Sequence, residues 1–585
     1  MSDFIYSKKN VENGKLTKEI QKIYHDDKPL VKEFHGGWGS LAVSQSLYNG
    51  FQPYETKDHL FVVIGGPVLY FQDNTFLKEI YGDIGSIAIY NRWVQGEIKW
   101  DEDLSGPFAI LIVDKESYEV QVITDLMSFI PIFIYQNPKN TILSTHVDIL
   151  ANVSNQKDNI DIVSHADFIL NSIVTFPYTV YNNIHQINPA SIHYLSNEPI
   201  ETNAYWEPKE ENKYRSINQA AEELRSSLKE YISRITSEVS NIAQFISGGE
   251  DSRTLSALLQ GNSRDAFIFL DHMNREGKVA KKAANAYGAN FNLNTRTKTH
   301  YLEILAACSD LVGSGSQYHH AHTFGFHKTC SLNEYSAVFG GLFSDALLKG
   351  IRVKKIRGSK RFPFIPDIKN SNYSPGKSLE NTLFTSDILE KLTKRRQIHL
   401  EYVKSFRKES AAEWFELWPS SMNMNIPNLH ANRRLFRSYE PFMANDIVKL
   451  SAAVPQNWKL NRKLFHKSAK PFLKPTKWLI HGDGRLPYFS WYFNAFIQFV
   501  FWTSRQVGKR TGYIKGNQGP WGEWNVVLNS SDWECFLDKY SDKSNEINIL
   551  FNNKDIKEIM NTDKLTIMQK VNLMQVLYQI NNRFE

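Results

Sequence analysis

The residues whose types could do chemistry are concentrated in one short segment, Ser247-Gly-Gly-Glu-Asp-Ser252. It follows an apolar run at 242–246 that is typical of a strand, and a segment with helical spacing starts near Thr254. Two adjacent glycines let the backbone turn sharply and bring its N–H groups close to an anion, and the helix adds the partial positive charge of its N-terminus. Asp251 can hold a Mg²⁺ ion that bridges phosphate oxygens. The segment therefore predicts a site for nucleotide phosphates, where a bare Gly-Gly pair would indicate only a turn.

The elements around this segment alternate between strand and helix. Strands are predicted at 242–246, 266–270 and 336–339, and helices at 217–235, 254–259 and 279–284. This alternation indicates a parallel, doubly wound α/β sheet, whose ligands bind at the carboxyl ends of the strands. From about residue 376 the chain is predicted to be mostly helical.

The first two hundred residues contain short β-branched and aromatic runs separated by Gly, Pro, Asp and Asn. Strands are predicted at 60–64, 108–113, 120–124 and 132–135. Their near-continuous apolar character is typical of sheets covered on both faces. A polar stretch at 207–213 suggests a linker. The chain of 585 residues is therefore predicted to form two domains, 1–206 and 214–585, with the α/β core of the second at about 214–350.

Composition excludes several classes of protein. Hydrophobic residues make up 42% and charged residues 22%, which is ordinary for a globular protein. The net charge of +6 permits an anionic ligand but is no nucleic-acid signature, so no nucleic-acid partner is expected. Cys308, Cys330 and Cys535 show no paired spacing, and the start of the chain lacks the apolar core of a signal peptide. A cytoplasmic enzyme is therefore expected.

Several segments match one known family in the same order along the chain. Ser247–Ser252 resembles the SGGxDS pyrophosphate loop of the asparagine synthetase B family, which includes β-lactam synthetases, lasso-peptide cyclases and amidotransferases of polysaccharide gene clusters. The other matching segments are Ser105–Ala109, Asp114, Asp125 with Pro131, Tyr205-Trp206, Glu276 with Ala280 and Ala284, Gly341–Gly350, Glu440–Met443 and Lys463–Lys467. The resemblance covers most of the chain.

The resemblance implies a fold and a reaction. The N-terminal domain is expected to be a degenerate β-sandwich of the N-terminal-nucleophile hydrolase type, flanked by helices. The second is expected to be an adenine-nucleotide alpha-hydrolase-like, or PP-loop, parallel α/β domain with a helical C-terminal region. Such a domain uses ATP and Mg²⁺ to join a carboxylate to AMP with release of pyrophosphate, and an amine then displaces AMP.

The resemblance also implies roles for individual residues. Asp251 and Asp345 are expected to hold the metal ion. Asp345 and Lys463 are expected to serve catalysis, with the lysine opposing the negative charge of the transition state. The residues expected to bind the nucleotide are Ser247, Gly248, Gly249, Asp251, Ser252, Gly341 and Ser344.

The chain departs from the family where glutamine would be hydrolysed. Glutamine-hydrolysing members need an N-terminal cysteine, because its free α-amine helps to activate the thiol. Here Ser2 follows the initiator Met, and the first cysteine is Cys308. The glutamine-binding N-G-E-I-Y-N segment is replaced by Gly65-Gly-Pro-Val-Leu-Tyr70, and the matching β-domain is predicted to begin near Gly37. The N-terminal domain is therefore interpreted as a structural remnant.

A second departure concerns the catalytic glutamate of the family's GEGSDE segment, whose place is taken by Leu342. Leucine cannot move a proton, so synthesis of free asparagine is not expected and the amine needs another base. The candidates for this base are Glu380, Tyr439 and Glu440. Arg253, directly after the loop, has two interpretations: a contact to phosphate or substrate, and a salt bridge at the helix terminus.

A histidine cluster and an apolar run are two further features, and neither defines a site by its sequence alone. His319, His320 and His322 have the residue type of a metal cluster, but adjacent side chains diverge and no carboxylate at helical spacing completes a site. The apolar run Tyr488–Trp502 is shorter than a membrane span needs and contains polar residues. A buried or partner-facing helix is favoured there over a membrane-surface anchor, and a precursor peptide or partner protein could bind to it.

Three functions remain open. The favoured one is an ATP-dependent ligase that joins a small-molecule or peptide carboxylate to an amine other than glutamine-derived ammonia, as in β-lactam or lasso-ring closure. The second is an amidotransferase that amidates an amino acid or a sugar carboxylate with ammonia. The third is a catalytically silent ATP-binding regulator, for which Leu342 and the altered glutaminase site are the arguments.

Overall fold

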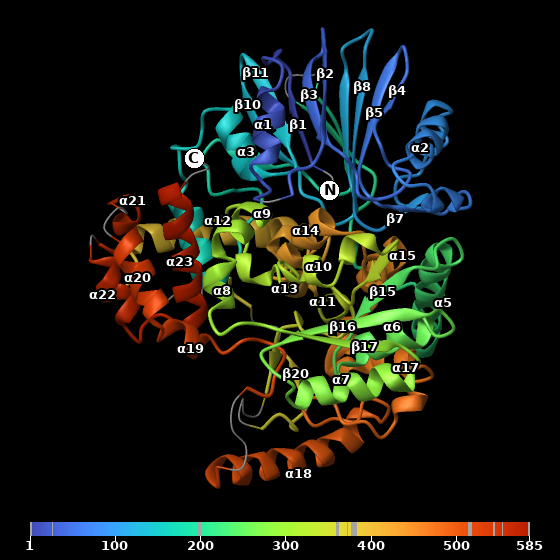
Figure 1. Cartoon of the computed structure of the whole chain (residues 1–585), viewed down its shortest axis with the longest axis vertical. Coiled ribbons are helices and arrows are strands. Elements are labelled where there is room, and N and C mark those ends of the chain that lie inside the picture. The colour runs from blue at the N-terminus through green and yellow to red at the C-terminus, as the bar shows by residue number, and fades with distance from the viewer. Residues whose placement is uncertain are drawn as a thin grey trace.

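The computed structural model describes residues 3–25, 27–195, 200–357, 362–370, 373–375, 383–512, 517–541, 545–552 and 554–582. Two of the candidate residues, Ser2 and Glu380, lie outside these ranges. The described chain is a mixed α/β structure, with antiparallel sheets in its N-terminal part and a parallel sheet later (Figure 1).

The N-terminal part contains two six-stranded antiparallel sheets. The first has the order β12-β10-β11-β1-β3-β2, and its strands are β1 (Phe4–Ser7), β2 (Val31–Gly36), β3 (Gly39–Ser44), β10 (Phe133–Asn137), β11 (Asn140–Ser144) and β12 (Ile184–Gln186). The second has the order β14-β13-β9-β8-β5-β4, and its strands are β4 (Tyr54–Glu55), β5 (His59–Gly65), β8 (Phe108–Asp114), β9 (Val120–Thr124), β13 (Ser191–Tyr194) and β14 (Glu201–Ala204). The four strands predicted in this region are all confirmed.

The two sheets pack face to face as a sandwich. Tyr6 and Leu41 of the first sheet share one buried cluster with Val62 and Leu111 of the second. The alternate residues of β8 are buried as well, because Ile110 packs in another cluster that includes the helix α5 (Ile217–Thr236). Burial on both faces explains the near-continuous apolar runs of these strands.

Helices cover the outer face of the first sheet. They are α1 (Lys15–Gln21), α3 (Val147–Val153) and α4 (Ile162–Asn171), and they bury apolar side chains against β1, β3 and β11. α2 (Ile84–Val94) lies beside β5 of the second sheet. The expectation of a sandwich flanked by helices is confirmed.

The sandwich begins at β1, so the prediction that it begins near Gly37 is wrong. Phe4 pairs with Val43, and Ile5 pairs with both Ala42 and Ser144, which places β1 inside the first sheet. A strand of four residues has too short a pattern to be recognised, and it is held by partners far away in the sequence. Residues 4–7 are therefore part of the sandwich.

The second part contains a parallel five-stranded sheet with the order β17-β16-β15-β18-β21. Its strands are β15 (Ile242–Phe245), β16 (Arg264–Leu270), β17 (Asn290–Thr295), β18 (Ala337–Phe339) and β21 (Ser438–Tyr439). The helices α6 (Glu250–Leu258) and α7 (Arg275–Ala286) alternate with them. α6 starts at Glu250 and not near Thr254 as predicted, so Asp251 and Ser252 lie in its first turn.

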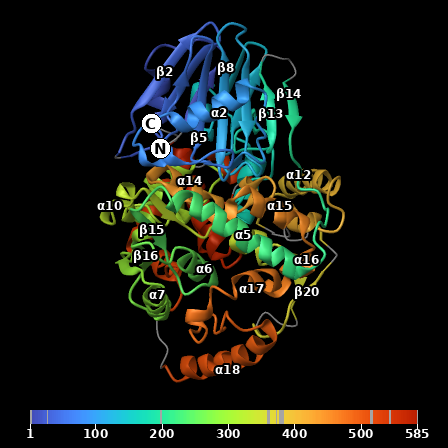
Figure 2. The same ribbon diagram turned by 90° about the vertical axis from the view of Figure 1, so that its right-hand side faces the viewer.

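The remainder is mostly helical, as expected. Its main helices are α9 (Leu305–Val312), α11 (Ser344–Leu348), α12 (Ser386–Lys404), α14 (Ile426–Leu435), α15 (Asn445–Ala453), α17 (Lys463–Ala469), α18 (Trp491–Arg510), α20 (Ser531–Tyr540) and α23 (Ile567–Asn582). The last helices return to the N-terminal part (Figure 1), and α23 packs against α4. Figure 2 shows the same chain from the side. Within the described residues, no helix has the length and apolar character needed to cross a membrane.

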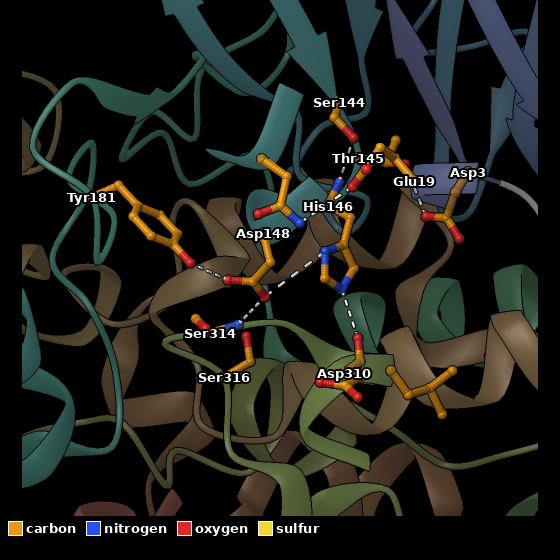
Figure 3. Close-up of polar contacts among 12 residues, drawn as sticks. Asp3, Glu19, Ser144, Thr145, His146, Asp148, Tyr181, Asp310, Ser314 and Ser316 are labelled. Carbon is orange, nitrogen blue, oxygen red and sulfur yellow. Dashed lines mark hydrogen bonds and ion pairs between the residues drawn. The ribbon is translucent and has the colours of Figure 1, made fainter. Parts of the chain in front are cut away.

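Polar contacts join the sandwich to α9 and to the residues directly after it (Figure 3). The Asp148 carboxylate accepts hydrogen bonds from the Tyr181 hydroxyl at 2.7 Å and from the Ser314 N–H at 2.8 Å. His146 Nε2 lies 2.8 Å from the carbonyl oxygen of Asp310. Burial, together with the nearby positive charge of Arg434, lowers the pKa of His146 to about 4. This imidazole is therefore neutral at pH 7.

Asp3 forms a second, fully buried link between the two parts. Its carboxylate accepts hydrogen bonds from Arg434 Nη2 at 2.7 Å and from Arg433 Nη2 at 3.0 Å, both on α14. Burial alone would raise the pKa of Asp3, but the two arginines outweigh it and hold the pKa well below its usual value. A buried charge with two paired cations fixes α14 against the start of the sandwich.

Candidate active site

A cavity lies beside the parallel sheet at the place where the strand order reverses. β15 is the central strand, and the chain leaves it toward β16 on one side and reaches β18 on the other. In open parallel sheets the crevice outside the carboxyl ends of two such strands is the usual ligand site. A cavity of about 840 Å³ occupies this place. Five of the predicted site residues line it, namely Ser247, Gly249, Asp251, Gly341 and Asp345.

The segment after β15 is held by its own side chains. Ser252 Oγ accepts a hydrogen bond from the Ser247 N–H at 3.1 Å, and Ser247 Oγ accepts one from the Gly249 N–H at 3.0 Å. The Gly248 N–H donates to Glu276 Oε1 at 2.6 Å. Gly248 and Ser252 do not line the cavity, but they fix the turn that presents Ser247 and Gly249 to it.

Arg253 holds this turn from behind. Its guanidinium group is buried and donates to the carbonyl oxygens of Gly248 at 2.7 Å and Leu479 at 2.9 Å. Burial lowers the pKa of Arg253 to about 10, so the group stays charged at neutral pH. Arg253 was predicted either to contact phosphate or substrate or to form a salt bridge at the helix terminus. In the structure it donates to backbone carbonyl groups instead.

Lys349, just after α11, joins the two aspartates predicted to hold a metal ion. Its ammonium group contacts the carboxylate of Asp251 directly and lies 2.9 Å from Asp345 Oδ1 and 3.5 Å from Glu250 Oε1. Its side chain is only 4% exposed. Burial opposes the charge, but the three carboxylates outweigh it and raise the pKa of Lys349. The lysine is therefore a fixed positive charge between two strand ends.

The same carboxylates were expected to hold Mg²⁺, and their oxygen donors have the right chemistry for it. In this structure, however, the Lys349 ammonium group lies between Asp251 and Asp345, where the ion would have to bind. Across the described ranges, no group of three or more His, Cys, Asp and Glu is arranged to hold a metal ion. As these residues lie, they do not fit a divalent cation, and a lysine supplies the positive charge.

The pKa values of the two aspartates around Lys349 are shifted in opposite directions. Burial raises the pKa of Asp251 to about 6, despite the ammonium group beside it. The pKa of Asp345 is lowered, chiefly by Lys349, and its side chain is 51% exposed. The more buried aspartate is thus the one that gains a proton first as the pH falls.

Besides Gly248 and Ser252, two further predicted residues do not line the cavity. Lys463, the first residue of α17, is half-buried and does not line it, because the next residues of α17 point into the core. The neighbouring Arg462 lines the cavity instead and lies 3.2 Å from Glu250. Ser344 is buried and donates a hydrogen bond to the Gly341 carbonyl oxygen at 3.2 Å, so it supports the turn after β18.

Glu440 is the candidate base that lines the cavity. Its Oε2 accepts a hydrogen bond from the Leu342 N–H at 2.9 Å, and its Oε1 accepts one from the Ser438 hydroxyl at 3.0 Å. Burial raises the pKa of Glu440 to about 7. A Cβ atom on Gly340 would lie 2.2 Å from Glu440 Oε1, so glycine makes room for this carboxyl group. Tyr439 does not line the cavity, and it is buried.

The rest of the lining combines an apolar wall with cations. Phe267, Ile268 and Phe269 of β16 line one side together with Trp521. The lysines and arginines of the lining are Arg275, Arg296, Lys349, Arg462, Arg505 and Lys509. Sequence reasoning assigned none of these six a role. Of these six residues, only Lys349 could have been singled out from the sequence, because it replaces a glycine of the family's GEGSDELFGG segment.

The three histidines pack with tryptophans. The His319 and His320 rings are 4.5 Å apart, and the His322 ring is 4.6 Å from that of Trp521. Burial lowers the pKa of His320 to about 4. His322 lines the cavity, so this cluster forms part of its aromatic wall.

Comparison with known proteins gives one family match. Residues 86–206 match the family described as "Glutamine amidotransferase domain". No curated protein matches the chain. The N-terminal sandwich is therefore similar to a glutamine amidotransferase domain over the part from β8 to β14, which includes strands of both sheets.

Solved structures overlap only weakly. The glutamine phosphoribosylpyrophosphate amidotransferase from B. subtilis, complexed with ADP and GMP, is 9% identical, with a TM-score of 0.23 over 50% of this chain and 65% of that chain. A structure described as the allosteric regulatory enzyme of purine biosynthesis is also 9% identical. Its TM-score is 0.22, and the match covers 50% of this chain and 80% of that chain. The NMN synthetase from Francisella tularensis is 12% identical, with a TM-score of 0.17 over 38% and 94%. Overlaps of this size carry no argument about function, and the match of residues 86–206 is what relates this chain to a known family.

Proposed function

We propose that the protein is an ATP-dependent amide-forming ligase that activates a carboxylate as an acyl-adenylate and releases pyrophosphate. The observation that carries this proposal is the composition of a single cavity. It is lined by the Ser247–Gly249 turn at the N-terminus of α6, by the buried cation Lys349 and by the carboxyl group of Glu440. A phosphate turn, a fixed positive charge and a titratable carboxyl are the parts that this chemistry needs.

The lining residues suggest one arrangement for ATP in this cavity. Its phosphates bind beside the turn before α6, where the first N–H groups of the helix and its terminus favour an anion. Its base packs against the apolar wall of β16, where Phe267 and Phe269 offer flat surfaces. Lys349 and Arg462 then face the pyrophosphate as it leaves and oppose its growing charge. In this arrangement the second part of the chain acts as a PP-loop domain.

Glu440 serves as the base for the second step. An amine that attacks the acyl-adenylate must lose a proton, and Leu342 cannot accept it. The Glu440 carboxyl group is fixed beside the Leu342 N–H and has a pKa of about 7, which suits proton transfer near neutral pH. We place Glu440 in the role that the family's glutamate has at position 342.

The amine is proposed to be part of a peptide or small-molecule substrate, as in lasso- or β-lactam-type ring closure. The altered segment Gly65–Tyr70 supports this, because it lacks the family's glutamine-binding residues. The match of residues 86–206 favours a second candidate, an amidotransferase that uses ammonia. Lys349 at the expected metal position favours a third, a nucleotide-binding protein without catalysis.

A screen of ATP cleavage products tests the proposal. The purified protein is incubated with labelled ATP, Mg²⁺ and candidate carboxylates: amino acids, peptides and uronic acids. We expect AMP and pyrophosphate with the true substrate. Glu440→Gln should still release pyrophosphate in the first turnover but should lose AMP release and amide formation, whereas the exposed control Glu102→Gln should behave as the wild type. ADP and phosphate as products would refute adenylation. Glutamate formed from glutamine would favour the amidotransferase.

A further inference from the structure

The helix α18 forms the end of the molecule farthest from the sandwich, and no other labelled element lies beyond it in either view (Figures 1 and 2). It is long and rich in aromatic residues, yet only Asn494 and Gly508 of its residues are buried. Of the two expectations for this run, a buried or a partner-facing helix, the first does not describe most of its surface, and the second stays a prediction. A terminal, exposed helix can meet a flat partner without obstruction.

The side of α18 that faces away from the protein is apolar. Tyr492 is 72% exposed, Phe496 66%, Phe499 47% and Val507 56%. Their spacing of four, three and eight residues places them on one face of the helix. Trp478, which is 65% exposed, extends this surface. We call these five residues the α18 outer face.

Trp478 belongs to the same surface through a chain of ring contacts. Its ring is 5.0 Å from that of Phe489, which is 4.8 Å from that of Phe493 in the first turn of α18. The segment before α18 therefore lies next to the helix, and its charges lie near the outer face.

The outer face lies in a strongly basic part of the chain. Residues 463–512 contain nine Lys and Arg and one Asp, a net charge of +8, whereas the whole chain carries +6. Lys474, Lys477 and Arg510 are exposed within this range. Outside it the chain is slightly acidic, so the positive charge of the protein is concentrated around α18.

We propose that the α18 outer face docks on a lipid bilayer that contains anionic headgroups, with the helix lying in the plane of the interface. Large aromatic side chains beside lysine and arginine, with no acidic residue in the helix, are the combination that interfacial helices use. Lysine is depleted at protein–protein interfaces, which disfavours a protein partner. Each basic side chain near an anionic surface adds attraction that salt weakens.

The docking does not depend on the proposed reaction, although it bears on its substrate. Arg505 and Lys509 of the same helix line the cavity at the carboxyl ends of the strands. By helical spacing these two residues lie on another side of α18 than the outer face, so a bilayer bound there lies across the helix from them. Molecules anchored in the bilayer are thereby brought close to the site.

Vesicle sedimentation with the full chain tests the proposal. Vesicles of phosphatidylcholine alone are compared with vesicles that also contain phosphatidylglycerol, at low and high salt. We expect the protein to sediment with the anionic vesicles and to be released by salt. The double variant Tyr492→Ser and Phe496→Ser should lower the apparent affinity about tenfold or more, because each exposed ring loses its burial in the interface.

Two further variants complete the design. Lys477→Glu with Arg510→Glu should weaken binding to the anionic vesicles, whereas Leu30→Ser, a 72% exposed residue next to β2, should bind as the wild type does. No sedimentation with anionic vesicles, equal sedimentation with neutral ones, or unchanged binding of the Tyr492/Phe496 variant would each overturn the proposal. A further outcome would also overturn the proposal. If the protein does not bind vesicles but forms a dimer in solution that the Tyr492 and Phe496 substitutions abolish, the α18 outer face binds a second copy of the chain.

Discussion

Replacing Glu440 by glutamine tests whether its carboxyl group is poised as a base. Burial raises the pKa of Glu440 from 4.5 to about 7. Between these pH values the folded protein keeps a proton on this carboxyl group that the unfolded chain has lost. The stability that Glu440 contributes is therefore present below pH 4.5 and is lost as the pH rises through about 7.

The size of this contribution to the free energy of unfolding follows from the difference between the two pKa values. At about 1.4 kcal/mol per pH unit it amounts to roughly 3 kcal/mol. Glutamine is neutral at every pH and can keep both hydrogen bonds, accepting from the Leu342 N–H and donating to the Ser438 hydroxyl oxygen. Glu440→Gln should therefore resemble the wild type near pH 5 and be more stable by roughly 3 kcal/mol at pH 8.

Urea unfolding followed by tryptophan fluorescence at pH 5 and pH 8 measures this difference. The exposed control Glu102→Gln should show no such pH dependence. In activity assays the wild-type rate should rise with pH with a midpoint near 7, while Glu440→Gln should bind ATP normally and lose about 10²–10⁴-fold in rate. A Glu440→Gln variant that is less stable than the wild type at pH 8 would refute the reasoning, because the carboxyl group would then be stably ionised.

Three other substitutions test the architecture of the site. Lys349→Met leaves the carboxylates of Asp251 and Asp345 unpaired, so we expect a loss of about 3 kcal/mol in unfolding free energy at pH 8 and a gain of Mn²⁺-induced thermal stabilisation. Equal Mn²⁺ stabilisation of the wild type would contradict the assignment of the lysine. Asp3→Ala leaves two buried arginines without their carboxylate and should cost about 3–5 kcal/mol in urea unfolding, whereas an unchanged midpoint would show that this link is unimportant. Gly248→Ala places a Cβ atom 3.0 Å from Glu276 Oε1 and should weaken ATP binding in calorimetry with little change in stability; unaltered affinity would mean that the turn does not hold phosphate.

Much of the fold could be predicted because its elements carry strong local patterns. The strands β5, β8, β9 and β10 and the alternation around β15 follow from apolar runs and from turn residues. β1 and β21 are among the strands that were not predicted. β21 has two residues and β1 has four, and a strand this short is defined by its partners rather than by its own sequence.

The site could be predicted in part for the same reason. The Ser247–Ser252 segment is local, so its place after β15 follows from the sequence. Arg462 and Trp521 reach the cavity from distant segments, which no spacing rule connects to the loop. Lys463 was predicted by analogy with the family, but the start of α17 directs its neighbour Arg462 to the cavity. The role of Lys463 stays a prediction.

The position of bound nucleotide tests the central claim most directly. A crystal structure with a non-hydrolysable ATP analogue should show its phosphates at the turn Ser247–Gly249, next to Lys349, and its base against Phe267 and Phe269. Phosphates bound at another surface, or no binding at saturating analogue, would contradict the assignment of this cavity as the site of adenylation.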